Sequence, residues 1–245
     1  MGAGGNLLRN IFSLSPEYEM LSEDKAPMEQ HLKEQFMLGY YSQSINSDTW
    51  LKREWSIRQG LYTKYYEAGL PTYWNPESLI AYDNHGAILI KDIGNHLSHW
   101  DRYKINEGTI TEQISQWALQ DCSHVFITTD NLNLLAEIYN SKNPTIDQFG
   151  KLKDFNQRYQ EFLLVNSTLH NNLLKLSDWL IQNNKQIYNI SVQDLFADSG
   201  HIAIRTLAAS LNLTINQSVI QQIHHLWLQS TREVYYNYFN RDLTI

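Results

Sequence analysis

Residues 124–129 decide the fold, and they read His124-Val-Phe-Ile-Thr-Thr. The run is short, apolar and rich in β-branched residues, a composition typical of a buried strand. Two similar runs flank it in the chain, Ala87-Ile-Leu-Ile after His85-Gly86, and Gln186-Ile-Tyr-Asn-Ile-Ser. Since the three runs lie far apart in the sequence, long connections must join them.

Helical patterns fill these connections. Residues 110–120 precede the central run, residues 132–139 follow it, and residues 151–183 carry apolar positions in register for a long amphipathic helix. Further helices are expected over 202–211 and 216–238. Parallel strands need a crossover of about a dozen residues or more, usually a helix. The pattern therefore predicts an α/β fold, a helix-rich, three-layer domain with a small parallel sheet.

Composition limits the class of protein. The 245 residues include 7 Trp, 15 Tyr and 8 Phe, which excludes a disordered tail, and no linker or repeat divides them, so a single domain over 1–245 is expected. The net charge of −7 argues against nucleic acid or an anionic membrane as partner. The single cysteine, Cys122, excludes an intramolecular disulfide and favours a cytoplasmic location.

A glycine-rich loop opens the chain. Gly2-Ala-Gly-Gly-Asn precedes a helix whose Leu7, Leu8, Ile11 and Phe12 lie near one face. Glycines let the backbone approach an anion, and a helix N-terminus adds partial positive charge, so the loop has the chemistry of a phosphate cradle. Arg9, one turn further on, is placed to bind a phosphate or to face solvent. The same glycines also suit a flexible end of the chain.

With this loop, most of the chain resembles the P-loop sulfotransferases. Gly4-Gly-Asn-Leu-Leu-Arg-Asn-Ile-Phe-Ser-Leu-Ser-Pro is similar to their loop and first helix, residues 124–139 resemble their 3′-phosphate strand and its helix, and residues 187–213 resemble their late strand and helix. The resemblance implies a P-loop-like domain that binds 3′-phosphoadenosine 5′-phosphosulfate (PAPS) and needs no metal. The implied donor-binding residues are Gly2, Gly4, Gly5, Asn6, Leu7, Arg9, Thr128 and Thr129.

The resemblance also implies where the acceptor reacts. The family's base is often a histidine or carboxylate just after the second strand, where this chain has Lys91, Asp92, His96 and His99. We expect His96 to act as the base, Lys91 to supply a cation and His99 to assist, with a glycan or small-metabolite hydroxyl as acceptor. A solvated loop is the alternative for both histidines. No third ligand accompanies them, and His224 and His225, being adjacent on a helix, cannot share one metal.

Departures from the family pattern keep a rival function open. The loop lacks the family's Lys or Arg before the glycine and its Ser or Thr after it. Thr129 and Glu137 stand where the family has an Arg and a Ser on the 3′-phosphate, and a carboxylate repels a phosphate. The rival is a non-catalytic P-loop-like binding or assembly module. A kinase-like nucleotide user is disfavoured because no Gly-Lys-Ser/Thr is present.

Overall fold

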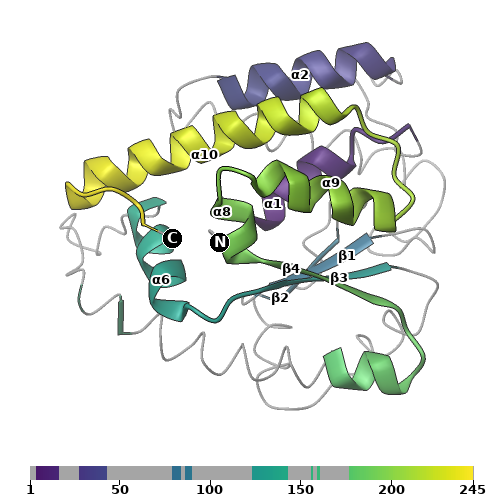
Figure 1. Cartoon of the computed structure of the whole chain (residues 1–245), viewed down its shortest axis with the longest axis horizontal. Helices are drawn as coiled ribbons and strands as arrows, with labels where there is room; N and C mark the ends of the chain where they lie inside the picture. Colours follow the sequence, from purple (N-terminus) through teal and green to yellow (C-terminus); the bar gives the residue numbers. More distant parts are fainter. Residues whose placement is uncertain are drawn as a thin grey trace, which may run out of the picture.

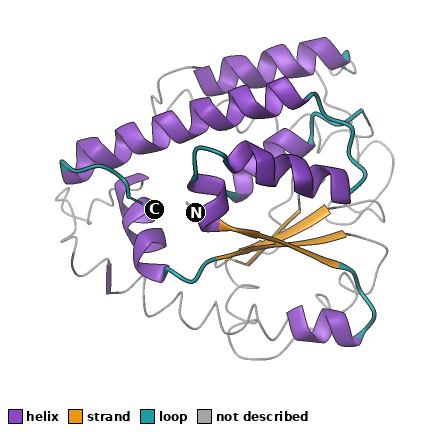
Figure 2. Ribbon diagram, viewed as in Figure 1, coloured by secondary structure: helices purple, strands orange, loops and turns teal. Residues whose placement is uncertain are grey.

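A four-stranded sheet lies at the centre of the computed structural model, which describes residues 4–16, 28–42, 79–83, 86–89, 123–142, 156, 159–160 and 177–244. The strands are β1 (Leu79–Asp83), β2 (Gly86–Leu89), β3 (Ser123–Thr128) and β4 (Ile187–Ser191), in the spatial order β2-β1-β3-β4. Strands β1, β3 and β4 run parallel, whereas β2 runs antiparallel to β1. Figure 2 shows helices surrounding this sheet.

Helices make up most of the described chain. They are α1 (Gly5–Phe12), α2 (Gln30–Ser42), α6 (Leu132–Lys142), α8 (Val192–Phe196), α9 (Gly200–Ser210) and α10 (Gln217–Phe239). The longest, α10, packs against α2, α6 and α9 (Figure 1). Across the described residues, no helix combines the length and the apolar character needed to cross a membrane.

The expected helix-rich α/β class is confirmed, and so are the strands around 124–129 and 186–191. The expectation of a parallel sheet is wrong for residues 86–89, which pair antiparallel with β1, a strand the sequence pattern did not reveal. The reason is the connection, because only residues 84–85 separate the two strands. Two residues suffice for a hairpin but not for a parallel crossover.

The core surrounds the central strand. Val125, Phe126 and Ile127 are consecutive in β3 and at most 2% exposed. Neighbouring side chains of a strand point to opposite faces, so protein covers both faces of β3. The apolar stripe of α1 joins the same core through Leu7, Leu8, Ile11 and Phe12.

Short polar caps start the helices that follow the strands. Asn131 accepts a hydrogen bond from the Leu134 amide at the start of α6, and Ser191 accepts one from the Asp194 amide at the start of α8. Asn216 caps α10 in the same way. Each cap satisfies an amide that has no partner within its helix. The chain therefore turns directly from β3 into α6 and from β4 into α8.

A crowded junction joins α8, α9 and α10 at Gly200. A Cβ atom there would lie 2.5 Å from the Asp194 carbonyl oxygen and 2.5 Å from Nε2 of His224. Contacts that short force neighbouring atoms to move. Gly39, inside α2, is the opposite case, because a Cβ at that position meets nothing within 4 Å.

We expect Gly200→Ala to destabilise the protein. Alanine improves helix propensity by up to about 1 kcal/mol, but overpacking costs about 1–3 kcal/mol, so the steric cost wins. The matched control, Gly39→Ala, should raise the free energy of unfolding by about 0.5–1 kcal/mol because it gains the propensity alone. Urea unfolding measures both. If both substitutions changed the free energy of unfolding equally, the close contacts of Gly200 would not be costly and the prediction would be wrong.

Candidate functional site

The carboxyl ends of β3 and β4 meet at one edge of the sheet. Thr128 pairs in register with Ser191, so the segments that follow the two strands leave from the same edge. Thr129, just after β3, is 3% exposed, and its hydroxyl oxygen accepts a hydrogen bond from the Asn131 amide at 3.0 Å. Ligands of open α/β sheets bind at this carboxyl edge.

The glycine loop reaches this edge through Leu195. Gly4 is buried with φ +92°, and a Cβ added to it would lie 2.8 Å from Cδ1 of Leu195, which belongs to the helix directly after β4. The Leu8 amide donates to the Gly4 carbonyl at 3.1 Å, which begins the hydrogen-bond ladder of α1. The amides of Gly5, Asn6 and Leu7 precede that ladder, at the positive end of the helix dipole.

Hydrogen bonds from other elements hold the far end of α1. Asn10 is 1% exposed, and its side-chain amide donates to the Tyr41 hydroxyl at 2.9 Å. The Gln30 side chain donates to the Leu14 carbonyl at 2.7 Å, and the Thr214 amide donates to the Ser15 hydroxyl. The start of α1 is therefore held in place by a helix that is anchored at its other end.

Of the predicted donor-binding residues, Gly4 packs against Leu195 in the helix that follows β4, and Thr128 ends β3 in register with Ser191, the last residue of β4. Thr129 follows Thr128 directly. Leu7 is 1% exposed and belongs to the core. Gly2, Lys91, His96 and His99 lie outside the described residues, and so do the side chains of Asn6 and Arg9. Within the described ranges, no three His, Cys, Asp or Glu residues form a metal-binding group.

Glu137 connects α6 to the end of α10. The Tyr235 hydroxyl donates to its Oε2 atom at 2.5 Å, and the Arg241 guanidinium donates to Oε1 at 2.7 Å. Burial, and then the hydrogen bond to Glu137, raise the pKa of Tyr235, so its phenol stays protonated. Arg241 also lies over the Phe239 ring, 5.4 Å from its centroid. The carboxylate of Glu137 is therefore paired with Arg241, whose side chain is 57% exposed, at the surface of the protein.

His224 supports the helix on which Gly4 rests. The imidazole is 1% exposed, and Nε2–H donates to the Leu195 carbonyl at 2.8 Å. Burial lowers the pKa of His224, against the opposing effect of this hydrogen bond, and the nearby His201, His225 and Arg232 lower it further. The imidazole is thus held neutral. The sequence predicted packing or surface roles for the two adjacent histidines, and His224 is buried while His225 is exposed.

The sequence did not reveal that Leu195 contacts Gly4 or that Gly200 packs at the junction of α8, α9 and α10. Gly200 follows Ser199, a helix-start signal, but nothing local shows that its missing side chain leaves room for His224. Comparison with known proteins adds no further residue, since no family model, curated protein or solved structure matches the chain.

The stability of the protein should fall on mild acidification. The pKa of His224 in the native state lies below its ordinary value of 6.5, so below about pH 6.5 the unfolded chain binds a proton that the native state refuses. The contribution of His224 is therefore complete above about pH 6.5 and is lost as the pH falls towards the lowered pKa. Urea unfolding at several pH values across this range measures the slope of the free energy of unfolding against pH.

Two glutamine variants assign that slope to one residue. His224→Gln keeps a donor for the Leu195 carbonyl and removes the titration, so the slope should flatten. His225→Gln, on the exposed neighbour, should change it much less, because burial is the larger cause of the lowered pKa of His224. A slope that persists in His224→Gln would contradict the assignment.

We expect Tyr235→Phe to lower the free energy of unfolding by about 1–3 kcal/mol, because it removes a buried donor to a charged acceptor. Tyr236→Phe is the matched control, since that side chain is 49% exposed and should change stability little. Thermal or urea unfolding compares the two. Similar losses in both variants would show that the Glu137 contact does not stabilise α10.

Proposed function

We propose that the protein is a P-loop-like, sulfotransferase-type protein that binds PAPS and transfers its sulfuryl group to a hydroxyl of a glycan or small metabolite. One observation carries the proposal. Gly4 adopts a left-handed conformation at the start of α1 and is packed against the helix that follows a parallel strand. The proposal is supported because helix-start amides bind anions and α/β proteins bind their ligands near the carboxyl ends of their strands.

The contacts of Gly4 support a binding role for the backbone. A non-glycine residue would be strained at φ +92° and would collide with Leu195, so the position requires glycine. The amides of Gly5, Asn6 and Leu7 suit the 5′-phosphosulfate group, because they offer donors and the positive end of a helix dipole without a cationic side chain. In this proposal Arg9 adds a guanidinium, and Thr128 and Thr129 serve the adenosine 3′-phosphate side.

The proposed reaction is a displacement at sulfur. The acceptor oxygen forms a bond to sulfur while the bond between sulfur and the bridging oxygen of the 5′-phosphate breaks. 3′-Phosphoadenosine 5′-phosphate (PAP) leaves with that electron pair, and His96 takes the acceptor proton. Lys91 and the amides of the α1 start stabilise the charge that develops on the transferring group, and His99 assists the base.

The non-catalytic binding module has support of its own. Thr129 uses its hydroxyl oxygen on the Asn131 amide, and Glu137 bonds Tyr235 and Arg241. The two positions aligned with the family's 3′-phosphate ligands thus make structural contacts within the protein. A chain that had replaced nucleotide ligands by internal contacts would have this arrangement.

Calorimetric titration with PAP and with ATP separates these functions. The transferase predicts that PAP binds and ATP does not, whereas the binding module predicts that neither binds. Arg9→Ala should weaken PAP binding about tenfold, the loss of one charge-assisted contact. The matched control is Arg205→Ala. Arg205 is an exposed residue of α9 whose guanidinium donates a hydrogen bond to the side chain of Gln217, at the start of α10, at 3.3 Å. Binding of neither nucleotide, or equal binding of both, would overturn the proposal.

A further inference from the structure

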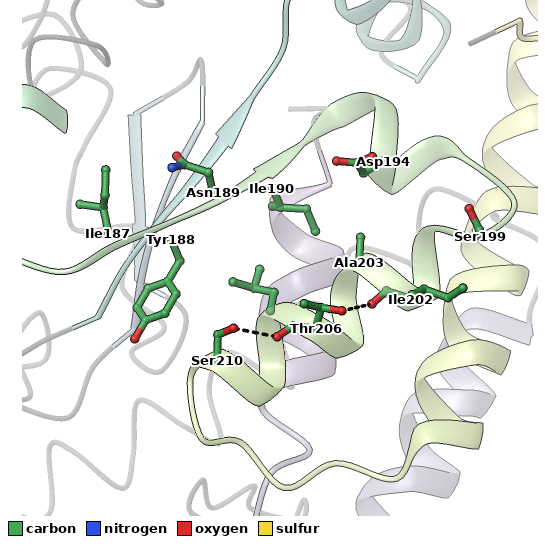
Figure 3. Close-up of a pocket in the computed structure, with 11 residues that line it drawn as sticks. Ile187, Tyr188, Asn189, Ile190, Asp194, Ser199, Ile202, Ala203, Thr206 and Ser210 are labelled. Atoms are coloured by element: carbon green, nitrogen blue, oxygen red, sulfur yellow. Dashed lines mark hydrogen bonds between the residues drawn. The ribbon is translucent and has the colours of Figure 1, made fainter.

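A groove of about 590 Å³ runs between β4 and α9 (Figure 3). One wall consists of four consecutive residues of β4, from Ile187 to Ile190, and the other comes from α9 together with Asp194 of α8. The described residues that line it do not include Gly4, Gly5, Leu7, Thr128 or Thr129. The groove is therefore a second feature of the molecule, separate from the α1 start.

The position of β4 in the sheet makes this groove a strand edge. β4 is the last strand in the order β2-β1-β3-β4, and it pairs with β3 on one side. Consecutive side chains of a strand point to opposite faces of the sheet, so a groove on one face would be lined by every second residue. All four residues of β4 line this groove, and none of the described lining residues belongs to β3. The groove therefore follows the outer backbone edge of β4, where the part of the chain that the structure describes places no partner strand.

The opposite wall is an exposed helix face of matching length. Ile202, Thr206 and Ser210 are spaced four residues apart along α9, and all three are exposed. The hydroxyls of Thr206 and Ser210 donate to the carbonyls of Ile202 and Thr206, so their protons are already used. Eleven helical residues and five strand residues each span about 16 Å. Such a slot between a strand edge and a helix suits one extended peptide.

The charge of the groove selects the peptide. Among the described residues that line it, Asp194 is the only charged one, and its exposed carboxylate accepts a hydrogen bond from the Ser191 hydroxyl at 2.7 Å. We propose that β4 and α9 form a docking site for an extended segment of a partner protein that carries Lys or Arg. The segment adds to β4 as a further strand, its backbone pairs with the edge, and its cation meets Asp194. A second copy of this chain fits less well, because it brings the same Asp194 and a like net charge of −7.

Affinity selection from two peptide pools tests the proposal. Both pools contain acetylated heptapeptides, randomised except for a fixed central Lys in one and Glu in the other. The immobilised full chain should enrich peptides from the Lys pool at least about tenfold over the Glu pool, and Thr206→Arg should abolish the enrichment by filling and charging the groove. Ala209→Arg is the matched control, since Ala209 is exposed on α9 and does not line the groove.

Amide hydrogen exchange gives an independent readout. An enriched peptide should slow the exchange of those amides of residues 187–190 that point away from β3, because they become part of a new ladder. Equal recovery from both pools, recovery that survives Thr206→Arg, or unchanged exchange in β4 would overturn the proposal. Dimerisation of the wild-type chain that Thr206→Arg prevents and Ala209→Arg does not would also overturn it, and would assign the edge to a second copy.

Discussion

The contacts of Leu195 are the constraint on which the rest of the described structure depends. Its carbonyl accepts a hydrogen bond from buried His224, and its side chain packs against the position of Gly4. One residue of a short helix thereby connects the beginning of the chain, the strand β4 and the long helix α10. A polar atom buried without a partner costs about 1–3 kcal/mol, so the bond from His224 removes a penalty as well as fixing a position.

Glycine is required on both sides of Leu195. Gly4 leaves room for its side chain, while Gly200 leaves room for His224 and for the carbonyls that end α8. Because the chain approaches itself so closely, packing against Leu195 and backbone geometry set the position of Gly4 at the start of α1. In our proposal, the backbone amides at the start of α1 and the Arg9 guanidinium bind the anion.

β4 has two separate uses in this molecule. Its carboxyl end leads into α8 and so to the start of α1, where we place the donor nucleotide. Its outer edge faces α9, where we place a basic peptide. Within the part of the chain that the structure describes, β4 ends the sheet, and a strand at the end of a sheet keeps unpaired backbone groups on one side. The two proposals involve different residues and can fail independently.

By itself the sequence determined the helix-rich α/β class, the strands near 124–129 and 187–191, and the helices α1, α6, α9 and α10, because periodicity and caps are local signals. Only the tertiary structure decided the hairpin of β1 and β2, the burial of Gly4 against Leu195, and the pairing of Glu137 with Arg241, 104 residues later. The physical reason is that these features depend on contacts between residues far apart in the chain. The same reason applies to Glu137. In the sequence it stands at the position of a phosphate-binding Ser of the family that the chain resembles, whereas in the fold it bonds Tyr235 and Arg241.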